Sequence, residues 1–454
     1  MWGTTIMTNL LSTCASTIAF IAMTSVAAVA QNITPEPIAL PPSEFPVPSS
    51  QLDAYIAAGN TVALRQHAWT LWSGLTANST QSYQGQNLPI WATWLSEDDV
   101  FSSPARLLAL ASKPRPLLSL APPRQFARAV PNMALRLGLN ASAPNSILAD
   151  VKMSPDSANF ITQSHATPAN SGQSYSYKSA TDLTRLNTAF NQQNTPVADR
   201  KIIDFPPAAT DLKLVFTTVS GTKLTPIPVW AGPGGSTTPK QPVSSTWTTC
   251  VAVDPTNSIT SPATITCNGK QIQAQVVPLN AFFSIRVDAT EANAVNQRAK
   301  LAGRAAVAAG DYHVLLAMHV TTKEIANWTW ATFWWQNGQS PPNKFPGSVD
   351  DMPDATKVKG AWRNYAMCVG DAMVSPANDP HGKPDVCFNP YLETPLPDGI
   401  DSNCMSCHAR ATVQPSARYP TTYLPNGWID LADPGIFGGK TRTDFVWAIP
   451  FAAQ

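Results

Sequence analysis

Alternating apolar and polar positions mark several strands in the middle of the chain. Residues 212–216 alternate, and so do residues 264–267 and 271–277 on either side of the pair Asn268-Gly269. An Asn-Gly pair between two alternating runs is typical of a β-hairpin with a type I′ turn, because both central residues of that turn need positive φ. Further strands are predicted at residues 226–230, 246–253, 282–287, 312–320 and 328–335.

Two of these strands, 312–320 and 328–335, have distinctive side chains. His313 and His319 stand an even number of positions apart on the first strand, so strict alternation places them on the same face. The second strand has tryptophan or phenylalanine at both odd and even positions, which indicates that both of its faces are buried.

Helical periodicity occurs in two places, after Asn60 and after Asp288. Asn60 is the predicted N-cap of a helix with an apolar face, and His67 within it is interpreted as a packed or surface residue. Asp288 and Glu291 have the spacing of a capping box, and the alanine-rich run after them predicts a helix to Ala309. The strand–helix–strand–strand order predicts an α+β fold with a β-rich core sheet, a few helices and long proline-rich loops.

The composition excludes some classes of protein. Only 13% of the 454 residues are charged and the net charge is +1, so no nucleic-acid partner is expected. The 42 prolines and 14 tryptophans predict long ordered loops held by aromatic packing rather than a helical bundle.

The beginning of the chain has the character of a secretory signal peptide. Residues 1–30 contain no charged side chain, include the apolar run 18–23 and end in Ala28-Val29-Ala30, an A-x-A cleavage pattern. The run is shorter than the roughly 20 residues that a spanning helix requires, so no membrane span is expected in the mature chain. The sequence therefore predicts a periplasmic or secreted protein.

The C-terminal quarter contains a C-x-x-C-H motif, Cys404-Met405-Ser406-Cys407-His408. This spacing is the attachment signature of a c-type haem: both cysteines form thioethers with the haem vinyl groups, and the histidine is the proximal iron ligand. With 7 Cys and 6 His in the chain, chance would produce the motif about once in a thousand such sequences. The alternatives are a thioredoxin-like dithiol, for which too little chain follows, and a structural cysteine pair, which leaves His408 unexplained.

A sixth iron ligand has to come from upstream, because no methionine follows Met405. His319 is the first candidate, since it lies on a predicted core strand just ahead of the tryptophan-rich strand. The other candidates are His313, His381, Met367 and Met373. A vacant position is a further alternative, and it would permit small-molecule chemistry at the iron. Candidates for contacts to the haem propionates and ring are Arg410, Arg442, Phe445 and Trp447.

Four cysteines remain outside the predicted signal peptide and the motif, and three pairings of them are possible. The nearest-neighbour scheme, Cys250–Cys267 and Cys368–Cys387, closes two short loops and is the predicted one. Disulfides agree with export to an oxidising compartment. Covalent haem agrees with it too, because thioether attachment is generally extracytoplasmic.

These features divide the chain into four regions. Residues 1–30 are the predicted signal peptide, and residues 31–200 form an N-terminal helical and loop region with a helical patch at 106–112. Residues 201–340 form the β-rich core region, and residues 341–454 form the C-terminal haem-binding region.

Several stretches resemble the exported monohaem proteins usually called cytochrome c family proteins. The resemblance is carried by residues 67–72, 226–230, 319–334, 362–365 and 402–411. It implies a secreted protein with one covalent haem c, and it implies no substrate. The sequence thus predicts a periplasmic monohaem c-type cytochrome that exchanges single electrons with a redox partner protein of unknown identity. The rival expectations are an open-site haem enzyme of the peroxidase or oxidase type and a haem module that binds gas.

Overall fold

The structure of the protein is a computed structural model. It describes Met1, Gly399 and residues 33–102, 116–123, 147–166, 172–230, 247–299, 306–336, 347–371, 386–394, 402–413 and 429–453. The predicted signal peptide, apart from Met1, and the predicted helical patch at 106–112 lie outside the described residues.

The structure has an α+β fold, as the sequence predicts. Its described α-helices are α1 (Ser49–Ala57), α2 (Thr61–Thr76), α3 (Ile90–Thr93), α4 (Glu97–Val100), α8 (Pro155–Thr162), α9 (Ala180–Gln192), α10 (Ala289–Ala299), α11 (Cys404–His408), α12 (Pro434–Phe437) and α13 (Ala448–Ala452). Short 3-10 helices occur at η2 (Val197–Asp199), η4 (Leu279–Ala281) and η6 (Gly360–Asn364). Within the described ranges, no helix combines the length and the apolar character that crossing a membrane requires.

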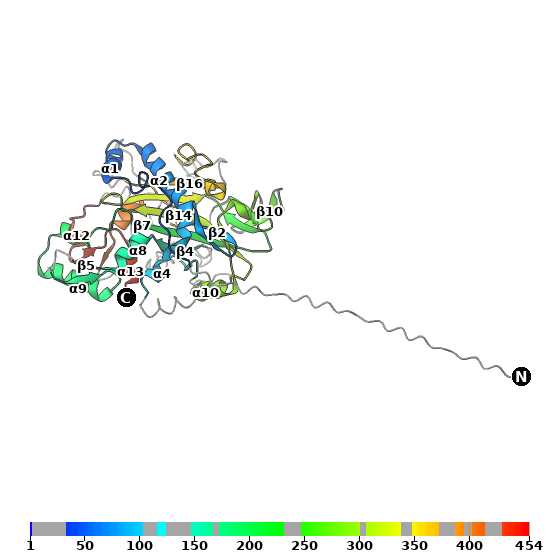
Figure 1. Cartoon of the computed structure of the whole chain (residues 1–454). Coiled ribbons are helices and arrows are strands. Elements are labelled where there is room, and N and C mark those ends of the chain that lie inside the picture. The colour runs from blue at the N-terminus through cyan, green and yellow to red at the C-terminus, as the bar shows by residue number, and fades with distance from the viewer. Residues whose placement is uncertain are drawn as a thin grey trace.

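The largest sheet has seven strands, and it is the core of the molecule (Figure 1). Its strands are β3 (Leu95–Ser96), β4 (Ile147–Met153), β7 (Thr210–Val219), β13 (Ser284–Arg286), β14 (Tyr312–Thr322), β15 (Thr329–Trp335) and β16 (Tyr365–Val369). The order across the sheet is β16-β15-β14-β7-β4-β3, and β13 also pairs with β14. The sheet therefore takes strands from the N-terminal, core and C-terminal regions alike.

Smaller strand pairs surround this sheet. They are formed by β1 (Asn78–Tyr83) with β2 (Gln86–Pro89), β5 (Ser164–Ala166) with β6 (Ser174–Ser176), β8 (Thr225–Pro228) with β9 (Cys250–Asp254) and β12 (Val276–Pro278), β10 (Ala263–Cys267) with β11 (Lys270–Ala274), and β17 (Thr412–Val413) with β18 (Thr441–Arg442). The predicted hairpin is confirmed: Asn268 and Gly269 join β10 to β11 with φ of 46° and 82°. Both predicted disulfides, Cys250–Cys267 and Cys368–Cys387, are present.

The two predicted helix starts are confirmed, but one helix is shorter than predicted. The Asn60 side chain accepts a hydrogen bond from the Ala63 amide at 3.1 Å, which caps α2. The Asp288 carboxylate accepts one from the Glu291 amide at 2.8 Å, ahead of α10. Residues 306–308 are not helical, so the prediction that this helix reaches Ala309 is wrong.

A bulge in β14 changes which of its side chains share a face. Leu315 lies opposite Phe216 of β7, but Ala317 lies opposite the next residue, Val215, so Leu316 is an extra residue without a partner. Such an insertion interrupts the alternation, because side chains before and after it change places between the two faces.

The bulge separates the two histidines of β14. His313 lies opposite Thr218, and its Nδ1 is hydrogen-bonded to the Thr218 hydroxyl at 3.0 Å. His319 lies opposite Lys213. Lys213 and Thr218 are an odd number of residues apart on β7, so their side chains point to opposite faces of the sheet. The prediction that His313 and His319 share a face is therefore wrong.

One face of the sheet is closed by helix packing, and we call it the packed face. It carries Phe216, Met318 and Phe333, all of them fully buried. Helix α2 lies across it and places Trp72 on Phe333, with ring centroids 4.2 Å apart and planes at 20°. Trp69 meets the same phenylalanine edge-on at 5.1 Å. This face is thus a tightly packed aromatic core.

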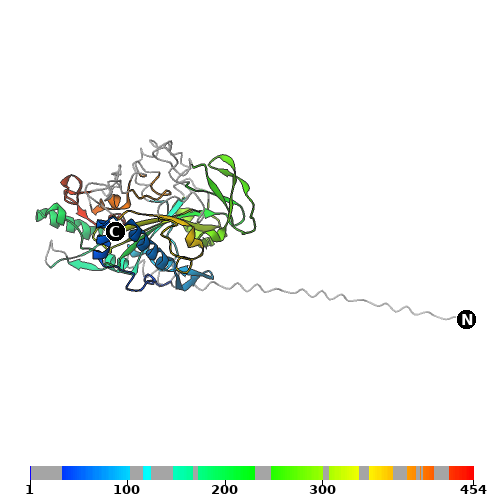
Figure 2. The same cartoon turned by 90° about the horizontal axis from the view of Figure 1, so that it is seen from above.

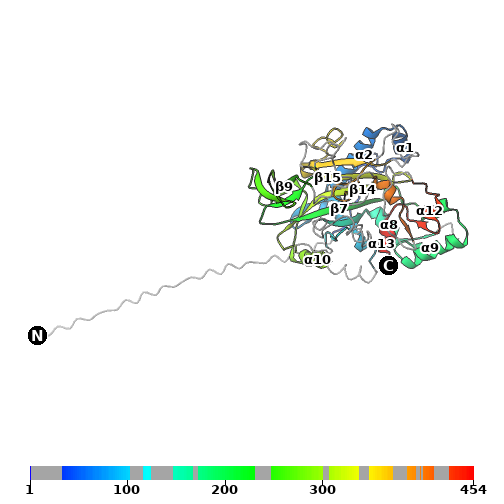
Figure 3. The ribbon, with the colours of Figure 1, turned by 180° about the vertical axis from the view of Figure 1, so that it is seen from behind.

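The opposite face, which carries Lys213, His319 and Trp330, is called the cavity face. Register places these side chains together, because Lys213 lies opposite His319 and Trp330 lies opposite Thr321 on the neighbouring strand. Figure 2 shows α2, in blue, and the orange C-terminal segment on opposite sides of the sheet. Figure 3, seen from behind, shows that segment together with α8 and α13 over the cavity face. The C-x-x-C-H motif therefore lies against the sheet.

Candidate cofactor site

The C-x-x-C-H motif folds into the short helix α11. Asn403 precedes it with a buried side chain, which accepts a hydrogen bond from the Ser406 amide at 2.8 Å and caps the helix. Residues three and four positions apart lie on one side of a helix, so Cys404, Cys407 and His408 share a side. Met405 is buried on the other side, within a hydrophobic cluster. The helix thus separates the three haem-type residues from the methionine between them.

The orientation of His408 is set by a backbone carbonyl. Its Nδ1 lies 2.8 Å from the carbonyl oxygen of Phe445, so Nδ1–H donates and Nε2 is left to accept or to bind a metal. The turn that presents this carbonyl has positive φ at two successive residues, 48° at Asp444 and 67° at Phe445. Such a conformation is strained for residues other than glycine and needs support from its surroundings.

Part of that support is a buried ion pair. The Asp444 carboxylate lies 2.7 Å from Nζ of Lys323, the first residue after β14, and both side chains are almost fully buried. Its other oxygen accepts a hydrogen bond from the Phe205 amide at 3.1 Å. The turn beside His408 is therefore tied to the end of the same strand that carries His319.

Burial also controls the protonation of His408. The pKa of the ring is lowered to about 3: desolvation lowers it most, the hydrogen bond to Phe445 opposes this, and the nearby charges of His319 and Lys213 add smaller decreases. The imidazole is therefore neutral at neutral pH, which is the form that coordinates metal ions.

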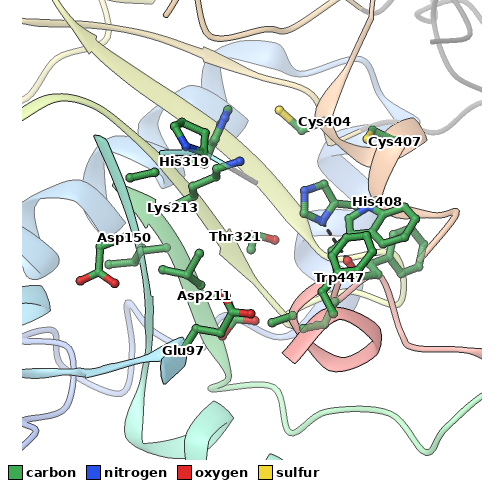
Figure 4. A pocket seen from close by; sticks show the side chains of 18 of the residues that line it. Glu97, Asp150, Asp211, Lys213, His319, Thr321, Cys404, Cys407, His408 and Trp447 are labelled. Carbon is green, nitrogen blue, oxygen red and sulfur yellow. Dashed lines mark hydrogen bonds between the residues drawn. The ribbon is translucent and has the colours of Figure 1, made fainter. Parts of the chain in front are cut away.

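A large cavity lies between α11 and the cavity face (Figure 4). The space that its lining residues surround, including the part that is open to solvent, measures about 1430 Å³, so the site is a partly open cavity. Cys404, Cys407 and His408 line it from α11. The aromatic part of its wall consists of Trp328, Trp330, Phe445, Trp447 and Phe451. The ring of Trp330 packs on His408 with centroids 4.4 Å apart.

His319 lines the same cavity from the sheet, beside Lys213. Its Nε2 lies 3.4 Å from the Glu393 carboxylate, and its buried Nδ1 makes no hydrogen bond to the described residues. The segment that carries Glu393 is held to β16 by the disulfide Cys368–Cys387. In addition, the Cys404 sulfur lies 3.8 Å from the Cys387 carbonyl. The structure therefore brings His319 and the motif together around one cavity.

The other predicted ligands and contacts have mixed outcomes. His313 and Met367 lie on the packed face, Met367 opposite Phe333, so both are away from the cavity. His381 and Met373 lie outside the described residues. Phe445 and Trp447 line the cavity as predicted. Arg442 does not: its guanidinium donates to the Ala198 carbonyl and lies over the ring of Phe437.

The far end of the cavity is acidic. Asp211 of β7 and Glu97 of α4 are both buried there, and Figure 4 shows their side chains turned toward each other. The Asp211 carboxylate accepts a hydrogen bond from the Ser157 hydroxyl at 2.6 Å. The pKa of Asp211 is raised to about 7: burial raises it most, the hydrogen bond from Ser157 lowers it, and the Glu97 charge raises it by a smaller amount.

Sequence reasoning misses several of these residues for identifiable reasons. The Phe445 carbonyl has no side-chain signature, and Glu393 lies far from His319 in the chain. Lys213 lies in the predicted strand at 212–216 and Asp211 directly precedes that strand, so polar side chains at alternate positions are a signal that one face here is polar. That signal, followed through, indicates a cavity or solvent on that face.

Cys404 and Cys407 take part in neither disulfide. Within the ranges that the structure describes, no three His, Cys, Asp or Glu side chains converge as a site for a bare metal ion. Comparisons with protein-family models, with curated proteins and with solved structures find no match.

Proposed function

We propose that this protein is an exported monohaem c-type cytochrome that transfers single electrons. One haem c would be held covalently by thioethers to Cys404 and Cys407, with His408 as the proximal ligand. When bound, the haem supplies an iron centre that gains or loses one electron. The partner would be a one-electron redox protein of the same compartment.

The observation that carries the proposal is the setting of His408. The ring is buried, neutral and oriented by the Phe445 carbonyl through Nδ1. A metal-binding histidine almost always donates its second ring N–H to a carbonyl or a carboxylate in this way. Both motif cysteines line the same cavity as the ring. A structural cysteine pair would require neither the cavity nor the oriented imidazole.

His319 is the sixth ligand in this proposal. It faces the same cavity from β14, and Glu393 lies beside one of its ring nitrogens while the other has no hydrogen-bond partner among the described residues. This is again the arrangement of a ligand with a supporting carboxylate. Two histidine ligands would lower the reduction potential relative to a histidine–methionine pair and would favour electron transfer over small-molecule binding.

A second candidate function is an open-site haem enzyme. The observation in its favour is the length of the cavity, which continues past His319 to the buried carboxyl groups of Asp211 and Glu97. If His319 does not bind the iron, a small molecule could enter there and receive a proton from these groups.

The covalent site is tested with the double variant Cys404→Ala/Cys407→Ala, expressed together with a haem-attachment system. Wild-type protein should keep its haem stain after denaturation, and the double variant should lose it entirely. Ser406→Ala is the matched control, because it changes the same helix and keeps both sulfurs. A haem stain that persists in the double variant, or that never appears in wild type, contradicts the proposal.

The choice between the two functions is tested by the absorption spectrum of the reduced protein with and without carbon monoxide. A six-coordinate, low-spin spectrum that carbon monoxide does not change is the expected result for electron transfer. A high-spin spectrum that changes at once on addition of the gas would favour the open-site enzyme.

A further inference from the structure

The buried carboxyl pair at the end of the cavity has no role in holding the cofactor, yet it lines the same space as His408. Asp211 points from β7 and Glu97 from α4. Among the described residues, Asp211 accepts a hydrogen bond from the Ser157 hydroxyl of α8, stands two positions before Lys213 on its own strand, and lies opposite Thr321 of β14, whose hydroxyl donates to the Thr329 carbonyl. Helix α13, which packs on α4, carries no charged side chain.

Other carboxylates of the neighbourhood are placed differently. Asp150 lies opposite Leu214 of the packed face and is engaged by Ser96 and Lys152. Asp150 lines the cavity, but its carboxylate accepts hydrogen bonds from the Ser96 hydroxyl and the Ser119 amide. Asp98 is one third exposed, at 35%, and is paired with Arg298 at 3.5 Å, so solvent screens it. The Asp99 carboxylate caps the start of α4, where it accepts a hydrogen bond from the Ser96 amide.

Two buried carboxyl groups that face each other do not both ionise readily, because the second charge has to form beside the first in a medium of low dielectric. Their shared protonation therefore responds to any further charge in the same cavity. An electron added at the cofactor site is such a charge, and it favours the protonated pair. Its effect is transmitted through the cavity with less screening than across the surface.

We propose that the Asp211–Glu97 pair is a proton-binding site that takes up one proton when an electron arrives at the cofactor. The inference rests on the proposed function and adds proton coupling to it. In this step, the redox partner gives one electron to the cofactor site and is itself oxidised by one electron. One proton passes from solvent to a carboxylate oxygen of the pair, where an O–H bond forms. Reoxidation releases both.

The test is the midpoint potential of the haem-loaded protein, measured by spectroelectrochemistry from about pH 5 to about pH 9. One proton per electron corresponds to a potential that falls by up to about 59 mV for each tenfold decrease in proton concentration. We expect such a slope around neutral pH in wild type. Asp211→Asn should remove it, because the amide cannot take up a proton.

A second variant keeps the test decisive if Asp211→Asn does not fold. Glu97→Gln removes the neighbouring charge, so the sloping region should move to lower pH. The control is Asp98→Asn, which changes a partly exposed carboxylate of the same helix, paired with Arg298, and should leave the slope unchanged. A redox difference infrared spectrum gives an independent readout: reduction of wild type should produce a protonated-carboxyl band that Asp211→Asn lacks.

The outcomes separate this inference from the proposed function. Absence of haem stain in denatured wild type contradicts the proposed function. A potential independent of pH in protein that carries covalent haem overturns the proton site and leaves the proposed function intact. A slope that survives in Asp211→Asn, or one that Asp98→Asn abolishes, also overturns it.

Discussion

The two faces of the central sheet differ in how they are filled. On the packed face, α2 inserts Trp69 and Trp72 against Phe333, and every one of these side chains is fully buried. On the cavity face, the same strands present Lys213 and His319 to a partly open cavity of about 1430 Å³. Both faces come from one set of strands. Alternate residues along each strand therefore pack against α2 on one face and line the cavity on the other.

This difference teaches how a functional site is built on a stable framework. The packed face contributes closely packed aromatic and aliphatic side chains, whose burial fixes the strands and their register. The cavity face then holds polar and aromatic side chains around a space that the chain itself does not fill. Substitutions on the two faces should therefore fail in different ways, by loss of stability on one and by loss of cofactor properties on the other.

The largest effect on stability is expected for Trp72→Ala. Removing a fully buried tryptophan leaves a cavity in the aromatic core, so the free energy of unfolding should fall by about 3–5 kcal/mol. Urea unfolding measures the loss, and the haem spectrum of the folded fraction should be unchanged. Trp447→Ala is the counterpart on the cavity wall: it should cost less stability and alter the spectrum. Equal stability losses for the two variants would contradict the comparison.

The second effect concerns the two disulfides, which close loops of similar length. Removing Cys368–Cys387 by a double alanine substitution should cost about 3 kcal/mol, and so should removing Cys250–Cys267. Only the first should disturb the haem spectrum, because it holds the segment with Glu393 and the backbone beside Cys404. A spectrum that is unchanged without Cys368–Cys387 would show that this link does not support the site.

Much of the packed face is predictable from sequence, whereas only part of the cavity face is. The aromatic residues of β15 stand at both parities, so their burial follows from the sequence alone. The motif at Cys404, Cys407 and His408 is equally legible, because its spacing is a chemical requirement. The bulge at Leu316 has no such local signal, since it depends on how β14 pairs with β7. It reassigns every residue of β14 before it, which is why His313 was misplaced.

The third effect is a pH dependence on the side of His313, where Glu291 is buried at 3.8 Å from it. Burial raises the pKa of Glu291 from 4.5 to about 7, with further contributions from Asp288 and Asp150. Between these two pH values, the Glu291 carboxyl group is protonated in the folded chain and ionised in the unfolded chain. The stabilisation from the protonated Glu291 is therefore complete below about pH 4.5 and lost as the pH rises through about 7, by about 3 kcal/mol.

This contribution is measured by urea unfolding at about pH 5 and about pH 8, with Glu291→Gln as the test variant. The glutamine stays neutral, so its free energy of unfolding should change less between the two pH values than that of wild type. The midpoint potential should keep its pH dependence, because Glu291 does not line the cavity. If the free energy of unfolding of Glu291→Gln changes as much between the two pH values as that of wild type, Glu291 is not the source of the pH dependence.

The smallest effect on stability, and the sharpest test of the two faces, is the pair His319→Ala and His313→Ala. Both histidines lie on β14, but the bulge directs His319 to the cavity and His313 to Thr218 and Glu291. His319→Ala removes a side chain beside open space, so the free energy of unfolding should change by less than about 1 kcal/mol. The reduced spectrum should become one that responds to carbon monoxide. His313→Ala should lower stability and leave the spectrum as in wild type, because His313 does not line the cavity in which we propose that the haem binds. If carbon monoxide does not change the reduced spectrum of His319→Ala, another residue is the sixth ligand. His319 then lines the cavity without binding the iron of the proposed haem.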